Sequence, residues 1–361
     1  MTPVEATLVY DMSKHCLRIK NSETNWSDCL LDKTQLTQMS AGKAQVAIGT
    51  NKPEGILHLQ NSDKEMGLVI PRVTSAESTT GLTSLIPVKA TLVLIFAQTL
   101  EKRIDDVILK EFSDAKGPGG VFQVTQKGKV LYQKAFGKAN LELNANLHAD
   151  YVFEIGSMTK QFTAIATLML EQQGKLSVND PISKYIKDYP NGDKITIHHL
   201  LTHTSGIKDF TKMKSITTIA QKEMKPEMMV DFFKNEPVDF APGEKFDYNN
   251  SGYVVLGHLI ELISGDSYEN FIQKNIFDKA GMNHSYYASD RKIVLKRASG
   301  YHKKESGYVN KTLISFSVSF SSGSLMSTLE DMLKWQNALH KNILLNSQET
   351  EKAFQKYRPY N

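Results

Sequence analysis

The pattern of hydrophobic and polar positions changes near residue 90 of this 361-residue chain. Before that point, short alternating segments lie between turn-forming residues, as is typical of β-strands. After it, longer segments repeat their apolar residues at the spacing of amphipathic helices. We therefore predict a β-rich segment over residues 1–88, an apolar linker over 89–99 and a larger domain over 100–361. The strands predicted in the first segment are residues 6–10, 45–48, 56–60 and 67–70.

The larger domain is predicted to begin with a helix that ends before the Gly-Pro-Gly-Gly sequence at residues 117–120. An alternating segment at 121–124, a Lys127-Gly128 turn and apolar residues at 130–132 then predict a β-hairpin. A helix followed by antiparallel strands indicates an α+β domain, with the helix packed against a sheet. The first helix is defined by Leu100, Ile104, Val107, Ile108 and Phe112.

Two further apolar helices are predicted later in the domain. The first follows Ser157 and ends near Gly174; the second follows Asn250 and ends at Gly265, with Asn250 or Ser251 as its N-cap. The apolar positions of the first are Phe162, Ile165, Ala166, Met169 and Leu170, and those of the second are Val254, Val255, Leu256, Leu259, Ile260 and Ile263.

Composition and charge narrow the classes of partner. The chain is 40% hydrophobic and 23% charged, and its 43 basic and 39 acidic residues give a net charge of +4. Because these charges form no long basic tract, we predict no nucleic-acid partner. The apolar run after Lys89 resembles part of a signal peptide, or else a buried strand or helix start, and it is too short to span a membrane.

Ser157 and Lys160 are the first candidates for chemistry. Ser-x-x-Lys occurs five times in the chain, so the setting has to distinguish this copy. The helical pattern puts Ser157 in a first turn, where unpaired N–H groups and the helix dipole favour negative charge on its oxygen. Lys160 lies one turn later on the same face, and burial would lower its pKa and let it take or relay a proton. The alternative is a helix-capping serine beside a solvated lysine.

Tyr248, in the sequence Asp-Tyr-Asn-Asn, is the next candidate. A turn at residues 241–244 precedes it and the second apolar helix follows it. A fully solvated tyrosine side chain has a pKa of about 10 and is a poor base at neutral pH unless a cation stabilises its phenolate. Lys160 would be such a cation.

The histidines do not predict a metal site. His199 and His203 are four residues apart, as in metalloprotease helices, but Leu200 stands where the catalytic glutamate would be. His15 and Cys16 form a single pair without a second cluster. We predict neither a metal nor a cofactor.

Four segments together resemble one family. They are VFEIGSMTKQFTAIATLMLEQQGKL, ITIHHLLTHTSGI, APGEKFDYNNSGYVVLGHLIE and SSGSLMSTLEDMLKWQNALH. In this order they resemble the class C-like branch of the serine beta-lactamases and penicillin-binding proteins, over residues 100–361. The resemblance implies a beta-lactamase/transpeptidase-like α+β fold, in which helices flank an antiparallel sheet beside a helical subdomain. Residues 1–80 resemble modules of fibrous surface and tail-fibre-like proteins, which implies oligomerisation through this segment.

The family resemblance implies a role for each candidate residue. Ser157 would be the acylated nucleophile, with its backbone N–H as one oxyanion donor, and Lys160 would belong to the proton network. Tyr248 would be the general base and leaving-group acid, and Asn250 would contact the substrate amide and orient the lysine. The implied substrate is a D-amino-acid peptide, a beta-lactam or a small ester, and the implied location is periplasmic or extracellular.

One departure from the family concerns the third active-site motif. The family carries Lys-Thr-Gly, Lys-Ser-Gly or His-x-Gly on a late strand, whereas here Lys311-Thr312 is followed by Leu313 and no His-x-Gly occurs. We therefore expect a domain that ends before its last strands. The alternative function is an inactive surface binding or structural protein, and only the hydrolase predicts acylation of Ser157.

Overall fold

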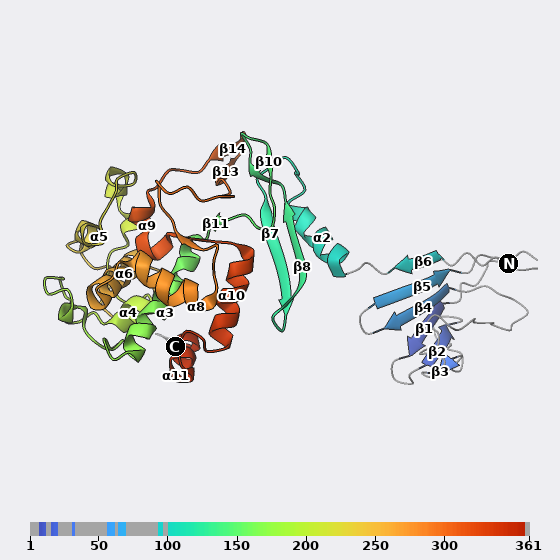
Figure 1. Ribbon diagram of the computed structural model, residues 1–361, viewed down its shortest axis with the longest axis horizontal. Coiled ribbons are helices and arrows are strands. Elements are labelled where there is room, and N and C mark those ends of the chain that lie inside the picture. The colour runs from blue at the N-terminus through green and yellow to red at the C-terminus, as the bar shows by residue number, and fades with distance from the viewer. Residues whose placement is uncertain are drawn as a thin grey trace, which may run out of the picture. The chain divides into compact units, whose positions relative to one another are not determined.

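The computed structural model describes residues 7–11, 16–20, 31–32, 56–61, 64–69, 93–96 and 100–357. The chain divides into two compact units, residues 1–111 and residues 112–361. Figure 1 labels the elements along the chain, from blue at the N-terminus to red at the C-terminus.

The first unit contains a six-stranded sheet in the order β3-β2-β1-β4-β5-β6, followed by helix α2 (Leu100–Glu111). Neighbouring strands are antiparallel except β1 and β4, which run parallel. Three of the four predicted strands are present with slightly shifted ends, and the prediction for residues 45–48 lies outside the described residues. The bounds are β1 Thr7–Asp11, β2 Cys16–Lys20, β3 Leu31–Asp32, β4 Ile56–Asn61, β5 Lys64–Val69 and β6 Val93–Phe96.

The second unit begins with the predicted hairpin. Strands β7 (Gly120–Gln126) and β8 (Lys129–Phe136) are antiparallel. Lys127 and Gly128 join them with φ values of 50° and 75°. Two positive φ values in a two-residue loop match the twist of the strands on either side, which is why a Lys-Gly pair serves here.

Three small antiparallel sheets complete the strands of this unit. In one of them β15 lies between β11 and β12, and Phe153 is opposite Ser327. This pairing joins the segment that leads into Ser157 to a segment about 170 residues later. The bounds are β9 Lys138–Asn140, β10 Ala145–Asn146, β11 Phe153–Glu154, β12 Tyr286–Tyr287, β13 Tyr301–Lys304, β14 Gly307–Asn310 and β15 Leu325–Ser327.

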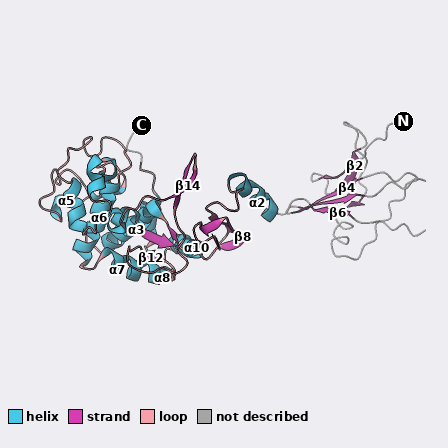
Figure 2. Ribbon diagram, turned by 90° about the horizontal axis from the view of Figure 1, so that it is seen from above, coloured by secondary structure: helices cyan, strands magenta, loops and turns pink. Residues whose placement is uncertain are grey.

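The second unit contains more helix than strand, and Figure 2 shows the helices in cyan. The α-helices are α3 Thr159–Gln172, α4 Ile197–Leu201, α5 Pro226–Phe233, α6 Asn250–Ser264, α7 Tyr268–Ile272, α8 Asp278–Ala280, α9 Phe316–Gly323, α10 Leu329–His340 and α11 Ser347–Phe354. Shorter turns are η1 Gly156–Met158, η2 Ile182–Lys184, η3 Phe210–Lys212, η4 Lys214–Thr218 and the π-helical turn η5 Gln273–Phe277.

Helices α3 and α6 pack side by side at the centre of the core, and α9 packs against both (Figure 1). Phe162 of α3 is fully buried and stacks on Trp335, with ring centroids 4.0 Å apart. Gly257 of α6 lets α9 approach closely, because a Cβ there would lie only 2.0 Å from the Ser321 side-chain oxygen. The elements that carry the candidate residues are therefore held against one another by close packing.

The ends of these helices differ from the prediction by one or two residues. Asn249, and not Asn250 or Ser251, caps α6: its side chain accepts a 2.8 Å hydrogen bond from the N–H of Gly252. Helix α3 begins at Thr159, so Ser157 lies in the preceding turn η1. Several polar residues in succession offer equivalent caps, and tertiary contacts select among them.

Among the helices of the described residues, none is long and apolar enough to cross a membrane.

Candidate active site

Ser157 lies in turn η1, between strand β11 and helix α3, and its side chain is exposed. Gly156 has a φ of 51°, a conformation that suits glycine and that turns the chain from the strand into the helix. No side chain caps η1 or α3 by a hydrogen bond, so the alternative of a capping serine is not what the structure shows. The hydroxyl is instead presented to solvent at the N-terminal end of a buried helix.

The ammonium of Lys160 lies at the centre of the candidate site, and this residue is only 6% exposed. Its Nζ donates to Asn250 Oδ1 and to the Ser322 carbonyl oxygen, both at 2.8 Å, and lies 3.4 Å from Ser157 Oγ. Burial lowers the pKa of Lys160, while the Tyr248 phenol opposes this effect and stabilises the charged form. The alternative of a solvated lysine is therefore wrong.

Tyr248 covers the same ammonium from the loop before α6. Its ring centroid lies 4.8 Å from Lys160 Nζ, which is within the range of a cation–π contact. The tyrosine is 41% exposed, and its ring also packs on His203, with centroids 4.6 Å apart. The Tyr248 side chain thus forms one wall of the site, where it contacts both the Lys160 ammonium and solvent.

Asn250 connects the lysine to a residue that the sequence did not single out. Its side-chain amide donates at 3.2 Å to Oδ2 of Asp209, which is 1% exposed. Together, Ser157, Lys160, Tyr248 and Asn250 lie close to one another in the structure, as the sequence predicts. Asp209 follows a glycine-containing turn in which an aspartate is ordinary, so the single sequence offered no signal for it.

The carbonyl of Ser322 is the second contact that the sequence did not indicate. It is aimed at Lys160 because α9 is interrupted at Phe320, which has φ 41° and ψ −133°. The carbonyl of the adjacent Ser321 accepts a 2.7 Å hydrogen bond from the Thr163 hydroxyl. A buried residue held in a rarely populated conformation is common at functional sites, where neighbouring contacts over-determine it.

The two nearby histidines accept hydrogen bonds from backbone N–H groups. His199 Nδ1 accepts from the N–H of Thr196 at 3.2 Å, and His203 Nδ1 accepts from the N–H of Asn249 at 3.0 Å. Among the described residues, no group of three or more His, Cys, Asp or Glu side chains is arranged to hold a metal ion. His199 thus helps to cap α4, and His203 holds the backbone directly after Tyr248.

His203 gives the site a pH-dependent stability. Burial, followed by the charge of Lys160, lowers its pKa from 6.5 to about 4, although Asp209 and Asp247 act in the opposite direction. Between pH 6.5 and 4, the unfolded chain therefore binds a proton at His203 that the folded chain does not bind. The contribution of this group to the free energy of unfolding is complete above pH 6.5 and is lost as the pH falls towards 4. We expect the stability difference between wild type and His203→Gln to shrink over that window, measured by urea unfolding at several pH values. A difference that does not vary with pH would contradict this assignment.

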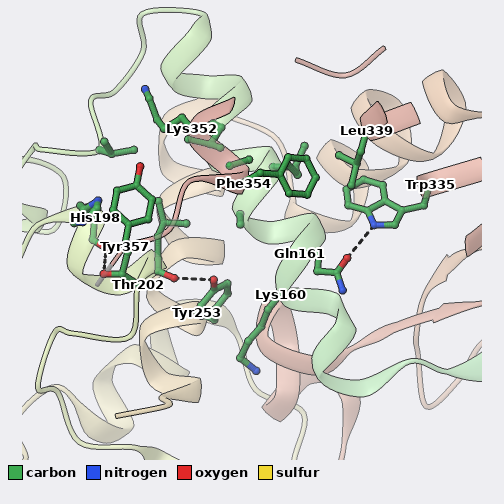
Figure 3. A pocket seen from close by; sticks show the side chains of 16 residues that line it. Lys160, Gln161, His198, Thr202, Tyr253, Trp335, Leu339, Lys352, Phe354 and Tyr357 are labelled. Carbon is green, nitrogen blue, oxygen red and sulfur yellow. Dashed lines mark hydrogen bonds between the residues drawn. The ribbon is translucent and has the colours of Figure 1, made fainter. Parts of the chain in front are cut away.

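An apolar cavity of about 360 Å³ lies beside the candidate site, between α3, α4, α10 and α11 (Figure 3). The stem of Lys160 borders it, but the Nζ atom points away from Phe354 and Tyr357 (Figure 3). That atom lies 3.4 Å from Ser157 Oγ. Because the reactive groups lie at the other end of the lysine, we do not assign this cavity to the reacting part of a substrate.

The combination of an exposed serine hydroxyl, a buried amine and an exposed phenol is suited to acyl transfer. A lysine with a lowered pKa can take or relay the hydroxyl proton, and the phenol can exchange protons with solvent. The α+β fold and these groups point to the class of serine acyl-transfer proteins.

Comparison with known proteins identifies the family. The family model described as Beta-lactamase matches residues 96–359, and the chain belongs to this family. The curated relative PbpX of Bacillus subtilis (strain 168), provisionally named a penicillin-binding protein, is 31% identical over 238 residues, which are 66% of this chain and 59% of that protein.

Solved structures agree with the family. A penicillin-binding protein from Bacillus halodurans matches with a TM-score of 0.61 and 31% identity, over 68% of this chain and 76% of that one. A D-amino acid amidase from Ochrobactrum anthropi SV3, solved with D-phenylalanine, matches with a TM-score of 0.61 and 25% identity, over 69% and 74%. These matches confirm the predicted fold class and superfamily. The chain spans 48–59% of the length of the first curated relatives it matches.

Proposed function

We propose that this protein is a serine hydrolase that cleaves an amide or ester through an acyl-enzyme on Ser157. The observation that carries the proposal is the position of Lys160 Nζ, which is buried, 3.4 Å from Ser157 Oγ and under the ring of Tyr248. An apo site often shows a longer nucleophile–base distance than the complex that reacts.

The proposed reaction has two steps. In the first, Ser157 Oγ bonds to the substrate carbonyl carbon, and its proton passes to Lys160 or Tyr248. The carbon–nitrogen or carbon–oxygen bond then breaks, and the leaving group takes up a proton from the same pair. In the second step, water attacks the acyl carbon, releases the acid and returns the proton to Ser157. The backbone N–H of Ser157 is the proposed first oxyanion donor.

The substrate classes we propose are D-amino-acid peptides, beta-lactams and small esters. The amidase from Ochrobactrum anthropi supports an amide, and the penicillin-binding relatives support a penicillin-like ring. We further propose a periplasmic or extracellular location, which is the one that the family resemblance implies. Oligomerisation through the β-rich residues 1–88 and the resemblance of this segment to fibrous proteins stay predictions.

The test is intact-mass analysis of the full chain after incubation with a fluorescent penicillin and, separately, with a reactive phosphonate. We expect one covalent adduct per chain, located on Ser157 by peptide mapping and absent from the matched variant Ser157→Ala. The wild-type chain and the variant should show the same circular dichroism, because the replaced hydroxyl is exposed. A folded wild-type chain that forms no adduct with either reagent would favour the alternative of an inactive binding or structural protein.

A further inference from the structure

We infer that Asp209 is a positioning residue whose carboxylate fixes the side chain of Asn250, so that the amide oxygen faces Lys160. The inference rests on the proposed function, because Asn250 and Lys160 belong to the proton network proposed above. Asp209 is on the turn before η3, about forty residues before Asn250, and it touches neither Ser157 nor Lys160 by a hydrogen bond that the structure shows.

The two oxygens of this carboxylate differ in their shortest contacts. Oδ1 accepts from the Thr211 N–H at 2.9 Å and from the Thr211 hydroxyl at 2.7 Å, which caps η3. Oδ2 accepts from both the backbone N–H and the side-chain amide of Asn250, each at 3.2 Å. The side-chain nitrogen of Asn250 also lies 3.5 Å from Oδ1 and 3.3 Å from the Thr211 hydroxyl oxygen. The shorter contacts give Oδ1 a mainly local structural role, whereas Oδ2 connects this turn to the candidate site.

The chemistry of the neighbours decides which way the amide of Asn250 points. An ammonium only donates hydrogen bonds, and an ionised carboxylate only accepts them. Lys160 therefore requires the amide oxygen on its side, and Asp209 requires the NH₂ on the other side. A flipped amide would place NH₂ against the ammonium and oxygen against the carboxylate, so both contacts would become repulsive.

The carboxylate also affects the lysine through its charge. Asp209 opposes the lowering of the pKa of Lys160 that burial causes, so its removal should lower that pKa further. The other groups whose contacts with the ammonium the structure shows contribute no ionised carboxylate. These groups are Ser157, Asn250, the Ser322 carbonyl and the rings of Tyr248 and Tyr253, with the neutral His203 nearby.

Asp209→Asn separates the local contact with Thr211 from the contact with Asn250. An amide at position 209 can still accept from Thr211 through one oxygen, but its NH₂ replaces the oxygen that faces Asn250. We expect the full chain carrying Asp209→Asn to form the Ser157 adduct with the phosphonate about 10- to 100-fold more slowly than wild type, a part of what general acid–base catalysis contributes.

Asp331→Asn is the matched control. Asp331 is also a buried carboxylate, in the first turn of α10. It accepts from the His284 N–H, the Ser285 hydroxyl and Lys334 Nζ, none of which belongs to the candidate site. We expect its adduct rate, expressed per folded molecule, to stay within about twofold of wild type. Equal slowing by both variants would assign Asp209 a purely structural role and overturn the inference.

A double variant, Asp209→Asn with Asn250→Asp, exchanges the carboxylate and the amide between the two positions and so keeps one donor facing one acceptor. The new amide would donate to the new carboxylate, which would in turn accept from Lys160. We expect this variant to recover part of the lost rate, and it keeps the test decisive if Asp209→Asn alone does not fold. A folded double variant no faster than Asn250→Asp alone would count against the inference.

A second readout does not depend on activity. The side-chain nitrogen of Lys160 can be followed by ¹⁵N NMR through a pH titration, with its signal assigned by Lys160→Arg. We expect its titration to move to lower pH in Asp209→Asn and to stay in place in Asp331→Asn. If wild type forms no adduct, the proposed function fails. The titration still tests whether the Asp209 carboxylate acts on Lys160. If wild type reacts and Asp209→Asn changes neither rate nor titration, the inference fails and the proposed function stands.

Discussion

Lys160→Met should slow formation of the Ser157 adduct by about 100- to 10,000-fold, the usual contribution of a positioned acid or base. Methionine keeps the length of the unbranched stem, so the packing along α3 is preserved. It removes the ammonium and with it the contacts to Ser157, Asn250 and Ser322. The measurement is the second-order rate of adduct formation from an intact-mass time course.

The expected change in stability is much smaller than the change in rate. Loss of the ammonium leaves the Ser322 carbonyl without that partner, which costs about 1–3 kcal/mol, but it also removes the cost of burying a charge. Lys334→Met is the matched control, because Lys334 pairs with Glu330 and Asp331 on α10. If both lysine variants reacted with the phosphonate at the wild-type rate, Lys160 would have no part in the chemistry.

The largest loss of stability that we expect follows Phe162→Ala. The Phe162 ring is fully buried, stacks on Trp335 and meets Phe277 edge-on with centroids 5.9 Å apart. Truncation removes this apolar contact and leaves a cavity between α3 and α10 that close-packed neighbours can fill only in part. We expect the free energy of unfolding of the second unit to fall by about 3–5 kcal/mol.

Urea unfolding followed by the fluorescence of Trp335 would measure this change. The chain has two tryptophans, so Trp26→Phe should be present in every protein compared. Phe354→Ala is the control, because it is the same replacement at a side chain that is 62% exposed. We expect it to lower the free energy of unfolding by less than about 1 kcal/mol. Equal costs for the two substitutions would mean that the α3–α10 contact does not support the core.

The elements that follow local patterns could be predicted from the sequence. The hairpin of β7 and β8 follows from alternation around a Lys-Gly turn, and the cores of α3 and α6 follow from apolar residues at helical spacing. The first residues of these helices could not be fixed, because the serines and asparagines before them compete as caps. Asn249 prevails since its amide also donates to the Ile207 carbonyl at 2.6 Å.

The candidate site was predictable to the extent that its residues carry a pattern. Ser157 and Lys160 are one helical turn apart, and Tyr248 lies between a turn and an apolar helix. The family resemblance then implied roles for Tyr248 and Asn250. Asp209 and the Ser322 carbonyl escaped prediction for physical reasons. An aspartate in a turn is usually solvated, and a backbone carbonyl has no side-chain identity that a sequence could reveal.

The contact between Lys160 and the Ser322 carbonyl has a consequence for how the protein is made. The two residues are separated by 162 positions, and the pairing of β11 with β15 spans a similar distance. Closing such long loops is slow compared with forming local helices. During synthesis, Ser157 and Lys160 leave the ribosome long before their partners on α9 do. In a nascent chain, Ser157 should therefore stay unreactive towards the phosphonate until the second half of the domain has emerged and folded onto the first.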